Sequence, residues 1–151
     1  MKYVVLTSML FVVACSGNDW VAEVRAAQER SDQALAAGQL AEADEILTPI
    51  SDGRMIGEAD AEQARAVRQD AFYQRARIAV RQEDGAAAER LADLGLALGG
   101  DDMFTANLHV VRGQANEMLG RAVEAAADYH RALLINERLL DEVLAAEEGT
   151  Q

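Results

Sequence analysis

The stretch that most restricts the fold is residues 104–136, where small side chains recur on both sides of a glycine turn. Gly113 stands seven residues before Gly120, and Ala125 follows that turn by five residues. Glycine ends a helix in a left-handed conformation that strains other residues. We therefore predict two antiparallel helices that touch at Gly113 and Ala125. The larger residues expected to fill the space beside these small ones are Tyr129 and Leu133.

The rest of the chain also predicts helices. Half of the residues are apolar, only 5% are aromatic, and the chain holds one proline. Alanine, leucine, glutamate, glutamine and arginine dominate the sequence after the first residues, and all are strong helix formers. Apolar periodicity and turn residues predict an all-α domain. Its helices are expected at about residues 20–37, 39–48, 58–82, 86–98, 104–119 and 121–146, with Asp101 or Asp102 capping the fifth and Pro49 just past the second.

The pattern of small residues recurs three times. Turns at Gly38, at residues 83–85 and at Gly120 lead to Ala43, Ala88 and Ala125, and the small residues seven positions before the turns are Ser31, Ala76 and Gly113. This pattern resembles the tetratricopeptide repeat, a helix-turn-helix unit of about 34 residues. The resemblance implies three stacked antiparallel hairpins in a right-handed array over residues 20–147. Pro49 and the uneven spacing of 45 and 37 residues between copies depart from it. The alternative is a generic helical bundle, in which these small residues reflect close packing alone.

The first residues predict a targeting segment. Lys2 precedes an apolar run over residues 3–14, which is too short to span a bilayer and typical of a signal peptide. The run ends in Val12-Val13-Ala14-Cys15, which resembles the bacterial lipobox, whose cysteine becomes the lipidated first residue. The resemblance implies that residues 1–14 are removed and that Cys15 carries palmitate and further acyl chains. The alternatives are a cleaved but unlipidated signal, or Cys15 as an ordinary buried residue.

The residues after the cysteine predict where the domain lies. In lipoproteins of this type an aspartate after the cysteine favours the inner membrane, so Ser16 implies transfer to the outer membrane, facing the periplasm. Residues 15–19 form a tether that reaches roughly 17 Å at most, which keeps the domain close to the membrane. At the other end, residues 148–151 are expected to be a frayed tail.

Charge and motifs argue against several function classes. A net charge of -12, with Lys2 as the only lysine, is unsuited to nucleic acid, which needs a cationic surface. No nucleophile, phosphate loop, metal cluster or cofactor motif is found. His109 is expected to be partly buried with a structural role and His130 solvated, and the carboxylates are expected on solvated helix faces. We therefore predict a protein that is not an enzyme and needs no cofactor or metal.

The resemblance also implies a binding groove, because the first helix of each such hairpin lines the concave side. The groove positions are Arg25, Gln28, Asp32, Asp70, Tyr73, Arg77, Asn107, Val110, Gln114 and Glu117. This mixed polar surface would hold an extended or helical peptide; alternatively, these residues simply face solvent. The lysine-based carboxylate clamp of some family members cannot be carried over, because no lysine follows Lys2. Trp20 is expected either in the core or as a membrane-surface anchor.

The C-terminal residues leave two possibilities. Leu139, Leu140, Val143 and Leu144 either fold back as a capping extension of the array or project as an apolar stripe. The leading prediction of function is a lipid-anchored adaptor that binds a protein or peptide partner at the cell envelope. The alternative is a structural envelope lipoprotein that associates with itself through the last helix.

Overall fold

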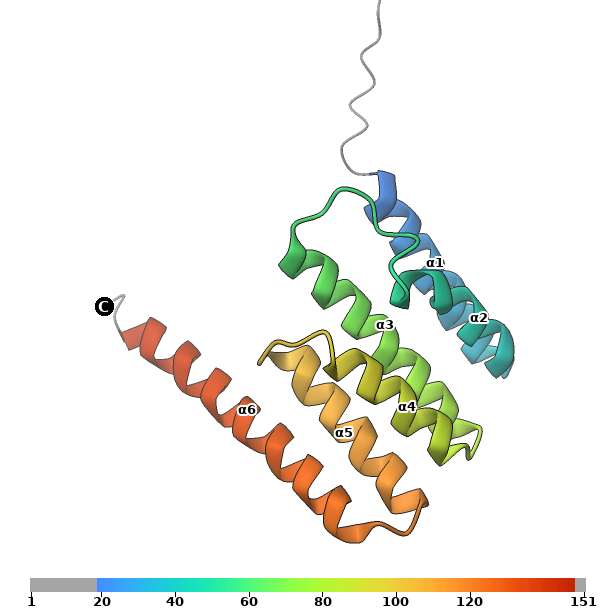
Figure 1. Cartoon of the computed structure of the whole chain (residues 1–151). Coiled ribbons are helices and arrows are strands. Elements are labelled where there is room, and N and C mark those ends of the chain that lie inside the picture. Colours follow the sequence, from blue (N-terminus) through green and yellow to red (C-terminus); the bar gives the residue numbers. More distant parts are fainter. Residues whose placement is uncertain (1–18, 149–151) are drawn as a thin grey trace, which may run out of the picture.

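The computed structural model describes residues 19–148, which form six α-helices and no strand. This confirms the all-α prediction. The helices are α1 (Asp19–Ala36), α2 (Leu40–Ser51), α3 (Ala61–Arg81), α4 (Gly85–Leu96), α5 (Met103–Met118) and α6 (Ala122–Glu148) (Figure 1).

Some sequence predictions concern residues outside the described range. They are the signal peptide, Cys15 with most of its tether, and residues 149–151 of the tail. Among residues 19–148, none of the helices combines the length and the apolar character needed to cross a bilayer.

Three short turns share one backbone geometry. Gly38, Glu83 and Gly120 each have positive φ, at 77°, 60° and 74°. In each case the next residue donates its N–H to a carbonyl five positions back, as in Asp84 to Ala79 at 3.0 Å. This closes the preceding helix in a Schellman motif. The turn lies at residues 83–85 as predicted, but Glu83 rather than the glycine takes the left-handed position. Gly85 instead begins α4, where a side chain would come within 3.1 Å of Met118 Cβ.

Glu83 therefore occupies a position that favours glycine. We expect Glu83→Gly to raise the free energy of unfolding by about 0.5–1 kcal/mol, because the relief of about 1–2 kcal/mol of left-handed strain exceeds the added entropy of the unfolded chain. Urea denaturation followed by circular dichroism measures the change. Glu83→Ala is the matched control, since it removes the same charge and keeps the strain. A glycine variant no more stable than the alanine variant would contradict this account.

Aspartates begin three of the helices. The Asp60, Asp84 and Asp102 carboxylates accept hydrogen bonds from backbone N–H groups in the first turns of α3, α4 and α5. Such caps satisfy donors that have no partner inside the helix. Asp102, one of the two predicted caps, accepts from both Phe104 and Thr105. The cap at Asp60 also explains why α3 begins at Ala61, later than the predicted residue 58.

Pro49 lies inside α2, so the prediction that this helix ends before the proline was wrong. Proline removes the N–H that would bond to the Glu45 carbonyl, and side chains make further hydrogen bonds to the helix around it. The Thr48 hydroxyl donates to the Asp44 carbonyl at 2.9 Å, and Arg68 Nε donates to the Ser51 carbonyl at 3.0 Å. Ile50 is fully buried, which holds the last turn in the core. The helix ends only before Gly53, where φ reaches 85°.

Each helix packs against the next one in sequence, and α3 also packs against α5. Figure 1 shows α1 and α2 at one end and α6 at the other. The largest core cluster joins α3, α4 and α5, and a second joins α1 and α2 to α3. At the α5–α6 contact, a Cβ on Gly113 would lie 2.5 Å from Tyr129 Cε1. The predicted packing of Tyr129 over Gly113 is therefore confirmed.

The structure overturns one prediction for α6 and disfavours the capping alternative for its end. Leu133 does not fill the α5–α6 contact but is 54% exposed. Successive side chains of a helix point about 100° apart, so Leu133 points away from the face on which Ala132 is buried. The helix also runs unbroken to Glu148, so its end does not fold back as a cap. No glycine or proline between Asn136 and Ala146 offers a place for the chain to reverse. Only Leu139 of the expected cap packs against the core, and the final turns of α6 extend past the start of α5 (Figure 1).

Candidate functional site

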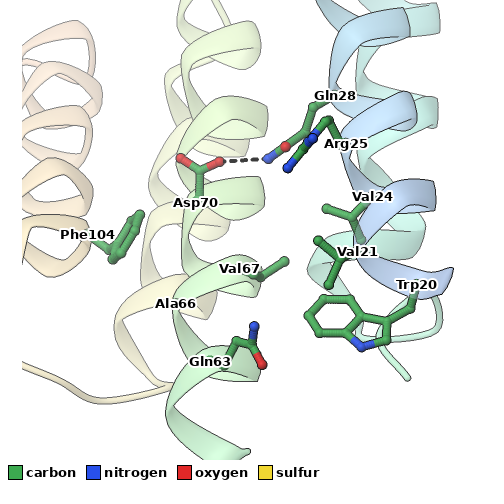
Figure 2. A pocket seen from close by; sticks show the side chains of 10 residues that line it. All are labelled: Trp20, Val21, Val24, Arg25, Gln28, Gln63, Ala66, Val67, Asp70 and Phe104. Carbon is green, nitrogen blue, oxygen red and sulfur yellow. Dashed lines mark hydrogen bonds between the residues drawn. The ribbon is translucent and has the colours of Figure 1, made fainter. Parts of the chain in front are cut away.

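The main candidate site is a cavity of about 310 Å³ where α1 and α3 diverge. No Cα atoms of these two helices approach within 8 Å, so side chains line the space between them. Trp20, Val21 and Val24 form the wall on α1, and Ala66 and Val67 form the wall on α3 (Figure 2). Such a volume lies at the lower end of the range for small-molecule sites, about 300–1,000 Å³. It suits one side chain better than a large ligand.

Packing fixes the tryptophan at one end of the cavity. Trp20 is the only tryptophan of the chain and is half-buried. A Cβ on Gly57 would lie 2.9 Å from the indole Cδ1, so the loop between α2 and α3 lies directly against the ring. The indole Nε1 is buried and has no hydrogen-bond partner. Trp20 therefore packs against the core cluster of α1, α2 and α3 and also forms part of the cavity wall.

Polar groups cluster at the other end of the cavity. Gln28 Nε2 on α1 donates to Asp70 Oδ2 on α3 at 3.1 Å, drawn as a dashed line in Figure 2. Arg25 lies beside Gln28, whereas Gln63 lines the end near Trp20 (Figure 2). Phe104 reaches the cavity from α5. Burial raises the pKa of Asp70, and the negative charge of Asp32 adds to this effect. The site thus combines apolar walls with one carboxylate held by a neutral amide.

The structure brings together some of the predicted groove residues. Arg25, Gln28 and Asp70 line the cavity, and Asp32 lines a smaller hollow beside Gln28 and Asp70. Tyr73 and Arg77 lie further along α3, with the guanidinium 5.5 Å from the ring centroid.

The predicted residues on α5 lie elsewhere. Val110 packs against the α5–α6 cluster, and Glu117 accepts a hydrogen bond from Tyr129 Oη at 2.8 Å. Asn107 is half-buried and Gln114 exposed, and neither lines the cavity. Sequence reasoning missed seven lining residues: Trp20, expected only as a core residue or membrane anchor, and six that resemble ordinary core or helix-surface positions. These six are Val21, Val24, Gln63, Ala66, Val67 and Phe104.

A second polar cluster lies between α5 and α6. Asp128 is 5% exposed, and its carboxylate accepts hydrogen bonds from Arg112 Nη2 at 2.6 Å, His109 Nδ1 at 3.0 Å and Asn116 Nδ2 at 3.0 Å. Burial raises the pKa of Asp128, but hydrogen bonds from Arg112 and His109 lower it by more. The pKa of this carboxyl therefore lies below its usual value. Arg112 also contacts Asp93 of α4 at 2.8 Å.

This Asp128 cluster corrects one prediction. We had expected the carboxylates on solvated faces, yet Asp128 is buried. His109 is half-buried as predicted, and His130 is exposed as predicted. Arg112 is already bonded to the Asp128 carboxylate. Within residues 19–148, no group of three or more side chains could hold a metal ion. The cluster is suited to joining three helices rather than to chemistry.

Comparison with models of known protein families gives no match, and a search of curated proteins gives none either. What the molecule does must therefore follow from its own residues and their geometry.

Proposed function

We propose that this protein is a lipid-anchored adaptor of the bacterial envelope, whose tetratricopeptide-like array binds a protein or peptide partner. The observation that carries the proposal is the cavity between α1 and α3. Three of the ten predicted groove residues, Arg25, Gln28 and Asp70, line it, and it combines apolar walls with the linked polar pair Gln28 and Asp70. Its volume of about 310 Å³ suits one side chain of a partner.

The repeat interpretation is supported by positions that behave alike in all three copies. Ser31, Ala76 and Gly113 are buried, as are Ala43, Ala88 and Ala125. Seven positions after Ser31, Ala76 and Gly113, each turn has a residue with positive φ: Gly38, Glu83 and Gly120. The Ser31 hydroxyl donates to the Ala43 carbonyl at 3.3 Å, which puts the two small residues of one copy in contact. Three stacked hairpins account for this correspondence better than a generic bundle does.

The anchor is proposed from the resemblance of residues 12–15 to the lipobox, with Ser16 directing the protein to the outer membrane. We expect the unmodified protein to partition with membranes and Cys15→Ser to move to the soluble periplasmic fraction. Fractionation of envelopes with an antibody against the protein measures this partition. Ser16→Asp is the companion variant, which should shift the protein to inner-membrane fractions. Unchanged partition of the serine variant would refute the anchor.

The adaptor function is tested by crosslinking in intact envelopes followed by capture of the protein. We expect a second protein in the captured material, and its yield should fall when groove residues such as Tyr73 are replaced. Tyr73→Ala needs a matched control, and Val123→Ala serves because Val123 is 80% exposed on α6, away from the cavity. Recovery of the protein alone would refute the adaptor.

A second function is favoured by the exposed end of α6. Leu140, Val143 and Leu144 are 58%, 57% and 49% exposed. An apolar stripe of this kind suits self-association, and the protein would then be a structural envelope component. Light scattering of the chain from residue 16, with and without residues 137–151, tests this alternative. Monomers in both cases would exclude it.

A further inference from the structure

The carboxylate in the cavity differs from the other buried carboxylates of the protein. Among residues 20–147, five acidic side chains are buried or half-buried. Four of them contact an arginine at 2.5–2.8 Å: Asp44 with Arg75, Glu89 with Arg121, Asp102 with Arg65, and Asp128 with Arg112. The fifth, Asp70, forms no ion pair with any residue that the structure describes, and its partners are the neutral side-chain amides of Gln28 and Gln74. A buried charge is costly unless it is paired, so Asp70 lacks the partner that the others have.

The surroundings of Asp70 set the chemistry of that partner. Asp32 adds negative charge nearby, and the described part of the chain is acidic throughout. Arg25 also lines the cavity, but its side chain is exposed and forms no ion pair with any residue that the structure describes. Between Asp70 and Trp20 the walls are mostly aliphatic, with the Gln63 amide and the Trp20 ring at the far end (Figure 2). A ligand that fits both ends must be an apolar stem that carries a cation.

We infer that the cavity receives one arginine or lysine side chain of the bound partner, with its cation on Asp70 and its aliphatic stem along Val24, Val67 and Trp20. Basic side chains bury their stems against apolar surface in this way. The charge of the partner segment would be complementary to that of the acidic array. The inference rests on the proposed adaptor function and specifies which residue type the partner presents. Burial raises the pKa of Asp70, as expected for a carboxylate that is shielded from water and lacks a cationic partner.

Two small probes test the cavity without knowledge of the partner. N-butylguanidinium reproduces an arginine side chain, and N-butylurea has nearly the same shape without the charge. Because Trp20 is the only tryptophan, its fluorescence reports on the cavity directly. In titrations of the full chain carrying Cys15→Ser, we expect the guanidinium to bind about tenfold more tightly than the urea. Equal binding of the two, or tighter binding of pentanoate to Arg25, would overturn the inference.

A variant of Asp70 then tests whether its carboxylate is the group that binds the guanidinium. Asp70→Asn keeps the shape and an acceptor for Gln28, and it should reduce guanidinium binding about tenfold, to the level of the urea. Asp141→Asn makes the same change at an exposed position on α6 and should bind like the unmodified chain. Undiminished binding by Asp70→Asn would refute the role of Asp70. The comparison of the two probes on the chain with Asp70 intact remains decisive even if Asp70→Asn does not fold.

The envelope capture experiment separates this inference from the adaptor function. Loss of the captured partner with Asp70→Asn, but not with Asp141→Asn, supports both. Equal capture by both variants leaves the adaptor standing and refutes the basic side chain in the cavity. Capture of no partner by the unmodified protein refutes the adaptor, whereas the probe titrations still decide what the cavity binds.

Discussion

Asp128→Ala should lower the free energy of unfolding by about 2–4 kcal/mol, one of the two largest effects that the structure predicts. The substitution leaves Arg112 without its main partner and removes the acceptor that Asn116 and His109 share. Breaking a buried ion pair costs about 3–5 kcal/mol. The expected value is lower here because the Arg112 side chain is 29% exposed and keeps Asp93. Urea denaturation followed by circular dichroism provides the measurement.

The control for Asp128 lies on the same helix. Asp141 is exposed on α6, so Asp141→Ala should change stability by no more than about 0.5 kcal/mol. A loss for Asp128→Ala no greater than for Asp141→Ala would show that the cluster does not join the helices.

The Asp128 cluster should also impose a pH dependence. Since the pKa of Asp128 is lowered in the folded protein, its contribution is present above the unfolded value of about 3.9 and is lost as pH falls through the folded value. The stability difference between the unmodified protein and Asp128→Asn should therefore shrink as pH falls from about 5 towards 2. A constant difference over this range would argue against an ionised Asp128.

The sequence carried most of the information about the helices. Turns at Gly38 and Gly120 were predictable because glycine takes positive φ without strain. The same reasoning failed at Glu83, because the glycine of this turn, Gly85, lies inside α4 against Met118 and not at the left-handed position. The packing of Tyr129 over Gly113 was predictable, because only a small residue allows a ring to approach the helix backbone.

The candidate site was harder to predict from the sequence than the helices were. Gln28 and Asp70 are 42 residues apart, and no local pattern shows that one faces the other. The cavity exists because the Cα atoms of α1 and α3 stay more than 8 Å apart, which depends on how all the helices pack. Asp128 did carry a signal, because it lies three residues after Ala125 and four before Ala132, both buried on one face of α6. A carboxylate at such a position requires a buried partner, and Arg112 on α5 provides it.

The other large effect concerns the point where three helices meet. A Cβ on Gly95 of α4 would lie 2.7 Å from Leu108 Cδ2 of α5 and 3.0 Å from Phe72 Cβ of α3. We expect Gly95→Val to cost about 2–3 kcal/mol, because the close-packed core must shift to admit the side chain. Leu108 is fully buried, so Leu108→Ala should cost about 2–5 kcal/mol. Leu140→Ala, at a leucine that is 58% exposed, is the control and should cost less than about 1 kcal/mol.

Combining the two core changes tests whether they act on the same space. Leu108→Ala removes the two methyl groups that Gly95→Val would strike, and the new valine occupies part of the cavity that the leucine leaves. The double variant should therefore be more stable than the sum of the single effects predicts, by about 1–3 kcal/mol in chemical denaturation. Full recovery is not expected, because Phe72 still limits the space on the side of α3. Additive losses would mean that Gly95 is small for another reason, such as the hydrogen bond that its carbonyl accepts from Gln69.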